Sequence, residues 1–84
     1  MSNEELTKYL NGINDCWQFF KGVMKESDTY DWTDAELWAD IIEKAETVAK
    51  KHEKKLITRI ICEMVGEIER VSGVVDRWKL EKVS

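Results

Sequence analysis

Proline is absent from the 84 residues, and the four glycines are scattered singly. Because tight hairpin turns depend on such residues, a sheet built from hairpins is disfavoured. One histidine and two widely separated cysteines leave too few ligands for a structural zinc site. No apolar run exceeds three residues, far short of the roughly 20 that a membrane-spanning helix needs. These shortages favour a soluble, all-α domain that binds no metal and crosses no membrane.

The chain also lacks an excess of positive charge. Its formal net charge is −4, with 13 basic and 17 acidic residues, and this disfavours general binding to nucleic acid, which needs a net basic face. Neither common glycine-rich phosphate loop occurs. The N-terminal residues are acidic where a secretory signal would be basic, so we expect a cytoplasmic protein.

The two cysteines, Cys16 and Cys62, both fall among apolar positions. We therefore expect buried, reduced thiols, because a disulfide would need an oxidising compartment. Cys16 and His52 form the one conceivable Cys–His pair for nucleophilic catalysis. His52 lies on an apolar stripe, where a histidine is more often packed than catalytic. We expect no enzyme activity and no cofactor.

The first predicted helix spans residues 3–25. Ser2 and Glu5 have the S-x-x-E spacing of an N-terminal capping box. Apolar residues then recur in an a/d heptad pattern, with Tyr9, Cys16 and Val23 as a second row and Phe19 beside them. The a/d residues are Leu6, Leu10, Ile13, Trp17, Phe20 and Met24. The two rows form an apolar arc of roughly 140°, too wide for one neighbouring helix to cover. This helix is therefore expected to be central or to meet another chain.

The second predicted helix spans residues 33–53. Thr33 and Glu36 match a second capping box, with Trp32 before them as a hydrophobic staple, so Thr33 is the expected N-cap. An apolar stripe runs from Trp38 to His52. Trp38, like Trp17 of the first helix, is expected in the core.

The third predicted helix spans residues 56–72 or longer, with a possible short fourth turn. Its apolar stripe runs from Ile57 through Ile68 to Val75 and Trp78. If residues 33–72 formed one continuous helix, this stripe would be rotated by roughly 120–130° from the stripe of residues 33–53. The chain either breaks near residues 52–56 or continues as one long helix that offers two faces to two neighbours. A break is favoured because three helices can then pack on themselves. Gly66 and Gly73 indicate either a helix stop at Gly73 or the close approach of a second backbone.

Eight acidic residues and one basic residue lie between Glu26 and Glu46. Acidic residues complement the dipole at a helix N-terminus, which is one interpretation. The other is a docking face for a basic protein partner, with exposed aromatic side chains as hot spots. The candidate protein-binding residues are Tyr30, Asp31, Trp32, Asp34, Glu36 and Asp40.

Five basic residues and one acidic residue lie between Lys50 and Arg59. Cations favour a helix C-terminus, but they can also bind a phosphorylated small molecule such as a signalling nucleotide. In an oligomer, several copies of this turn could converge on one ligand. The candidate ligand-binding residues are Lys50, Lys51, Lys54, Lys55 and Arg59.

Residues 14–72 carry an arrangement of short segments that resembles small, uncharacterised helical proteins of phages and prophages of Gram-positive bacteria. The segments are residues 17–21 (WQFFK), an acidic linker, residues 34–38 (DAELW), residues 43–46 (EKAE), residues 50–52 (KKH) and a final amphipathic helix. The resemblance implies no enzymatic activity. Many such accessory proteins act by binding a host or defence protein, or a defence signalling nucleotide.

Together these patterns predict a single domain over residues 1–84, folded as a small antiparallel three-helix bundle that self-associates. The preferred function is non-catalytic binding, as an accessory protein or inhibitor directed at a host or defence protein. The alternative is an oligomeric sponge for a phosphorylated small molecule.

Overall fold

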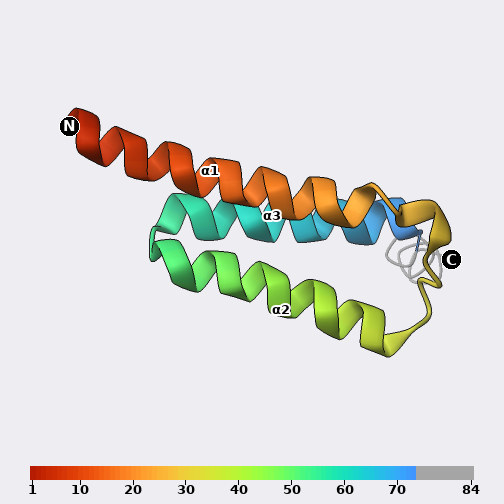
Figure 1. Cartoon of the computed structure of the whole chain (residues 1–84). Coiled ribbons are helices and arrows are strands. Elements are labelled where there is room, and N and C mark those ends of the chain that lie inside the picture. Colours follow the sequence, from red (N-terminus) through yellow and green to blue (C-terminus); the bar gives the residue numbers. More distant parts are fainter. Residues whose placement is uncertain (74–84) are drawn as a thin grey trace, which may run out of the picture.

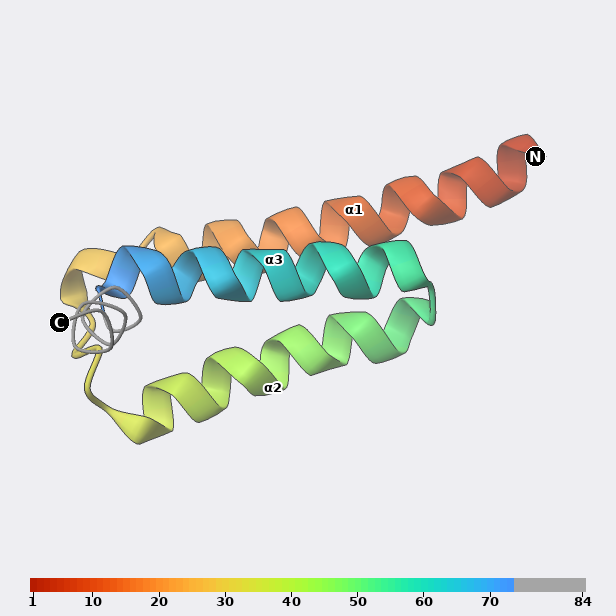
Figure 2. The same ribbon diagram turned by 180° about the vertical axis from the view of Figure 1, so that it is seen from behind.

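Residues 1–73 form three α-helices, each antiparallel to the one before it, as Figures 1 and 2 show from opposite sides. This computed structural model describes residues 1–73. Helix α1 spans Asn3–Met24, a short 3₁₀ helix η1 spans Ser27–Thr29, α2 spans Ala35–His52 and α3 spans Lys55–Ser72. The predicted all-α three-helix bundle is confirmed. No helix within residues 1–73 is long and apolar enough to span a bilayer.

The predicted break between the second and third helices is also confirmed. Helix α2 ends at His52, and Glu53 takes a left-handed conformation (φ 48°) while its N–H still donates to the carbonyl of Ala49. The extended Lys54 then starts α3. This two-residue connection reverses the chain, so the two differently directed apolar stripes face one core. The predicted stripe positions Val75 and Trp78 lie outside the described residues.

The start of α2 corrects one prediction. Asp34, and not Thr33, is the N-cap, because its carboxylate accepts the backbone N–H of Glu36 at 2.9 Å. Thr33 is engaged elsewhere: its hydroxyl and its N–H both donate to Asp31, at 2.5 and 3.0 Å. The predicted cap of α1 is confirmed, since Ser2 accepts the N–H of Glu5 at 3.2 Å.

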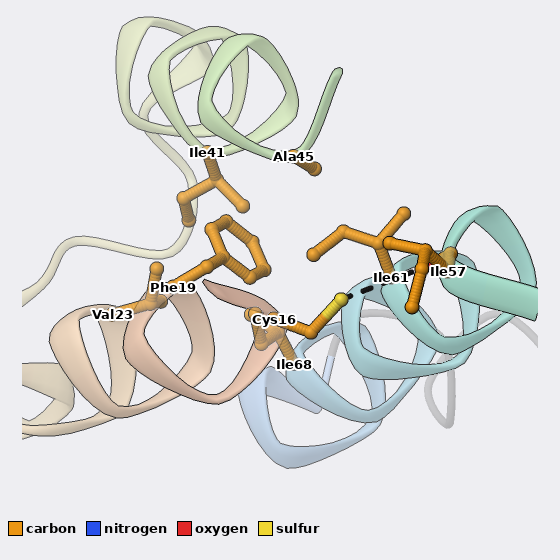
Figure 3. Packing of buried hydrophobic residues seen from close by; sticks show 8 residues of the cluster. All are labelled: Cys16, Phe19, Val23, Ile41, Ala45, Ile57, Ile61 and Ile68. Atoms are coloured by element: carbon orange, nitrogen blue, oxygen red, sulfur yellow. Dashed lines mark hydrogen bonds between the residues drawn. The ribbon is translucent and has the colours of Figure 1, made fainter. Parts of the chain in front are cut away.

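The core collects side chains from all three helices around a centre of isoleucines (Figure 3). In the described part of the chain, eight residues form the buried hydrophobic core: Cys16, Phe19, Val23, Ile41, Ala45, Ile57, Ile61 and Ile68. From α1, Cys16 and Val23 of the second predicted row supply the core together with Phe19. The first four residues of the a/d heptad row face outward, whereas its last two, Phe20 and Met24, are partly buried against the core. Trp17 is 50% exposed, so its prediction as a core residue is wrong, whereas Trp38 is partly buried. The prediction for Cys62 is wrong too: its side chain is exposed, while that of Cys16 is buried, and both thiols are free.

Helices α1 and α3 approach closely at Gly12. A Cβ atom on Gly12 would lie 2.6 Å from the side chain of Ile57, which is fully buried. Any larger residue at this position would force the side chain of Ile57 to move. Gly22, on the same helix, and Gly66, on α3, have open space where a Cβ would stand. Gly73 (φ 81°) caps the C-terminus of α3, as the helix-stop interpretation predicts.

Substituting alanine at two glycines of α1 separates helix propensity from packing. Gly12→Ala forces a methyl group against Ile57, and we expect it to lower the free energy of unfolding by about 1–3 kcal/mol. Gly22→Ala meets no atom and should raise it by about 0.5–1 kcal/mol, since alanine favours the helix. Urea denaturation of both variants measures the difference. Equal effects at the two positions would contradict the close approach.

Candidate functional site

A groove of ≈ 690 Å³ runs between α1 and α2, and no residue of α3 lines it. Its apolar surface comes from both helices, because Phe19 and Val23 of α1 face Ile41 and Leu37 of α2. Gly22 leaves the α1 wall open, since no atom lies within 4 Å of the place of its Cβ. The result is an apolar hollow of ligand-pocket size between two helices, a common position for binding sites in helical bundles.

Charged side chains line the same groove. Its carboxylates belong to Asp15, Glu26 and Asp40, and its ammonium groups to Lys44 and Lys51. Both lysines are already paired within the molecule: Lys44 with Asp40 at 2.9 Å, and Lys51 with Asp15 at 3.1 Å. The hydrogen bond from Lys44 to Asp40 raises the pKa of Lys44. Once these two pairs are made, the remaining carboxylate, Glu26, gives the groove a negative balance.

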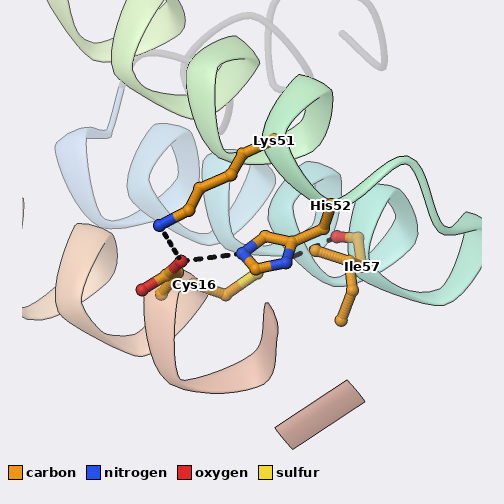
Figure 4. A network of polar contacts seen from close by, with 5 residues as sticks. Cys16, Lys51, His52 and Ile57 are labelled. Carbon is orange, nitrogen blue, oxygen red and sulfur yellow. Dashed lines mark hydrogen bonds and ion pairs between the residues drawn. The ribbon is translucent and has the colours of Figure 1, made fainter. Parts of the chain in front are cut away.

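Asp15 ties α1 to the end of α2. Figure 4 shows its two partners, Lys51 and His52, reaching from α2 toward α1 beside Cys16. One of its carboxylate oxygens lies 2.7 Å from Nε2 of His52 and 3.1 Å from Nζ of Lys51. The hydrogen bond with His52, followed by that from Lys51, lowers the pKa of Asp15, because both stabilise the ionised carboxylate. The side chain of His52 is 10% exposed, in agreement with its predicted packed role.

Cys16 lies next to this network, but its thiol points into the core. Its Sγ donates to the carbonyl of Ile57 at 3.9 Å. Burial, with a smaller effect from the charge of Asp15, raises the pKa of Cys16. A raised pKa keeps the thiol protonated and therefore a poor nucleophile. The Cys16–His52 pair considered from the sequence thus lacks the activated thiolate that catalysis would need.

The predicted protein-binding residues lie along the connection and the start of α2. The rings of Tyr30 and Trp32 are partly buried, at 5.3 Å centroid separation, and Trp32 also packs on Trp38 at 5.5 Å. Nε1 of Trp38 donates to the carbonyl of Trp32 at 2.7 Å, which fixes the connection against α2. These aromatic rings therefore stabilise the packing of the connection against α2 and also contribute to the protein surface. The four acidic residues are exposed: Asp31, Asp34, Glu36 and Asp40.

The five predicted ligand-binding cations are spread over different sides of the bundle. Lys51 turns to Asp15 beside the α1–α2 groove, and the ammonium of Lys54 lies 4.6 Å from the ring centroid of Tyr9. Arg59 lines a second groove, between α1 and α3. Lys50 and Lys55 are exposed at the helix ends. The reversal at Glu53 separates side chains that are close in sequence.

Sequence reasoning missed Asp15, Gly22 and Glu26 as residues of the groove. Asp15 is one carboxylate among 17 acidic residues, and no spacing distinguishes it before the end of α2 is placed against α1. Apart from its small size, nothing in the sequence distinguishes Gly22 as a groove residue. The charge excess of residues 26–46, which the sequence does reveal, provides Glu26 and Asp40.

Within residues 1–73, no group of three or more histidine, cysteine, aspartate or glutamate side chains is arranged to hold a metal ion. Comparisons of the chain with protein-family models, curated proteins and solved structures found no match.

The Asp15 network predicts an acid-sensitive contribution to stability. A carboxyl whose folded pKa lies below its unfolded value, about 3.9, stabilises the fold above that value, and the contribution is lost as the pH falls through the folded pKa. We expect Asp15→Asn to be less stable than the wild type at pH 7, and the difference to shrink below about pH 4. Thermal unfolding of both proteins across this range measures it.

The control is Glu43→Gln, which removes a carboxylate at an exposed position of α2. It should change stability little at either pH. A deficit of Asp15→Asn that persists unchanged at pH 2 would contradict the role assigned to the ionised carboxylate.

Proposed function

We propose that this protein is a non-catalytic binding protein whose α1–α2 groove receives a basic, amphipathic segment of a partner protein. The observation that carries the proposal is the combination, in one groove, of an apolar surface from two helices and a rim with a negative balance. An amphipathic helix docking its apolar face in a hydrophobic groove is a recurring mode of peptide recognition.

The apolar wall supports a side-chain anchor from the partner. Phe19, Val23 and Ile41 belong to the buried core, and their edges reach the groove. A surface made from core residues is rigid, so little conformational entropy is lost when a partner packs on it. Gly22 provides the space into which such an anchor fits.

The charges favour a basic partner. Glu26 lies at the rim, and the exposed acidic residues of η1 and the first turns of α2 continue from it. Opposite charges on a partner would raise the association rate and orient the segment in the groove. A phosphorylated ligand is less well supported, because the five cations of residues 50–59 do not line one common surface.

The resemblance to small phage and prophage proteins is consistent with this mode of action. Accessory proteins of that kind act on host or defence proteins, and we extend the proposal to such a partner in the cytoplasm. The core-facing thiol of Cys16, whose pKa is raised by burial, is not placed to act as a nucleophile.

Filling the groove tests the proposal directly. Gly22→Trp places an indole in the groove, at a position where a Cβ meets no atom within 4 Å. We expect it to weaken partner binding at least about tenfold, a loss of roughly 1.4 kcal/mol. The readout is a titration with a basic amphipathic helical peptide, or with an identified partner, followed by chemical-shift changes at groove residues.

The matched control is Gly66→Trp, which adds the same side chain at an open glycine of α3. It should bind like the wild type. Shift changes that appear on addition of nucleotide at Lys50 and at residues 53–59, with none at groove residues, would replace this proposal by the phosphate-binding alternative.

A further inference from the structure

The outward row of α1 is a large apolar surface that the bundle does not cover. Leu6, Leu10, Ile13 and Trp17 are 51%, 63%, 41% and 50% exposed. Exposed apolar residues are ordinary when they are scattered singly, but a contiguous row of this kind marks an interaction site. The row lies on a different side of α1 from the groove proposed above, which Asp15, Phe19 and Gly22 line.

The two halves of this row have different surroundings. The first turns of α1 project beyond the α2–α3 connection, as both views show (Figures 1 and 2). The second half borders a groove of ≈ 460 Å³ between α1 and α3. Its lining is mostly apolar, from Trp17 and Phe20 of α1 and from Ile60 and Met64 of α3. The N-terminal half of α1 therefore presents an apolar face on a projecting helix, and its C-terminal half forms one wall of an apolar groove.

We infer that a second copy of this chain covers the row, in an antiparallel dimer where the projecting half of each α1 lies in the α1–α3 groove of the other. The a/d spacing fits this arrangement, because in an antiparallel pair each a residue faces a d residue of the partner. A twofold axis beside residue 15 then matches every member of the row. The pairs are Leu6 with the partner's Met24, Leu10 with the partner's Phe20, and Ile13 with the partner's Trp17.

Charge complementarity favours the same direction. The two rows on the solvent side of the stripe are uncharged in their central part, at Thr7, Asn11, Asn14 and Gln18. Charges appear only at the two ends, as Glu4 at the start of α1 and as Lys21 and Lys25 at its end. Antiparallel pairing places the end of α1 that carries Glu4 alongside the partner's end that carries Lys21 and Lys25, whereas parallel pairing would bring like charges together. Depletion of charge at the centre with polar residues at the rim is typical of protein interfaces.

Sedimentation equilibrium of the full chain tests the dimer. We expect the wild type to have twice the 9.9 kDa mass of the chain. Leu10→Lys should weaken association at least about 100-fold, because each dimer would bury two charges in its apolar seam. The matched control is Ile42→Lys, the same kind of change at an exposed isoleucine of α2, and it should remain dimeric. Far-UV circular dichroism checks that both variants are folded.

A charge exchange tests the antiparallel direction. Glu4→Lys and Lys25→Glu should each weaken the dimer at low salt, and the double variant should recover it, because the swapped charges again face each other across the interface. The two positions are about 30 Å apart within one α1, so the recovery cannot arise inside a single chain. A wild-type monomer at millimolar concentration, or a dimer that Leu10→Lys leaves intact, would overturn the inference. Failure of the double variant to recover would overturn the antiparallel pairing.

Dimerisation and partner binding in the α1–α2 groove can be tested independently. Leu10→Lys lies outside the α1–α2 groove, so it should still bind the basic peptide, while Gly22→Trp should still dimerise. Loss of one property without the other identifies which of the two proposals has failed.

Discussion

The contact between Gly12 and Ile57 sets the geometry on which the rest of the bundle depends. Because Gly12 presents no side chain, α1 lies directly against the first turns of α3, and Ile57 is completely buried beneath it. This contact also fixes the rotation of α1. The face that holds Gly12, Cys16 and Phe19 turns inward, and the more regular heptad row is left outside from Leu6 to Trp17. A thin core results, as expected for so short a chain.

This rotation explains why two different surfaces are available on a single helix. On one side of α1, core residues reach a groove with a charged rim. On another side, the uncovered row provides an apolar strip with uncharged flanks. In the arrangement we propose, the first receives a basic segment and the second receives another copy of the chain. Dimerisation would fill the α1–α3 groove of each chain and leave its α1–α2 groove free, so one dimer could hold two partner segments.

Much of the fold could be predicted from local chemistry. The absence of proline, the apolar periodicities and the Ser2 cap predict helices close to those observed, and the change of stripe direction predicts the break near residue 53. The prediction of Thr33 as the N-cap was wrong because two adjacent side chains, those of Thr33 and Asp34, both carry an oxygen that can cap α2. Asp31 engages the hydroxyl and N–H of Thr33, and this leaves Asp34 to receive the first free N–H groups of α2.

The sequence by itself determined the helices, their approximate ends and the charge of each segment, because these follow from interactions between residues close in the chain. Only the tertiary structure decided which row of α1 is buried. Both rows are apolar, and periodicity alone cannot choose between them. The choice comes from the space that Gly12 leaves for Ile57 and from the pairing of Asp15 with His52 and Lys51, contacts between residues far apart in sequence. The groove residues and the uncovered face follow from that choice.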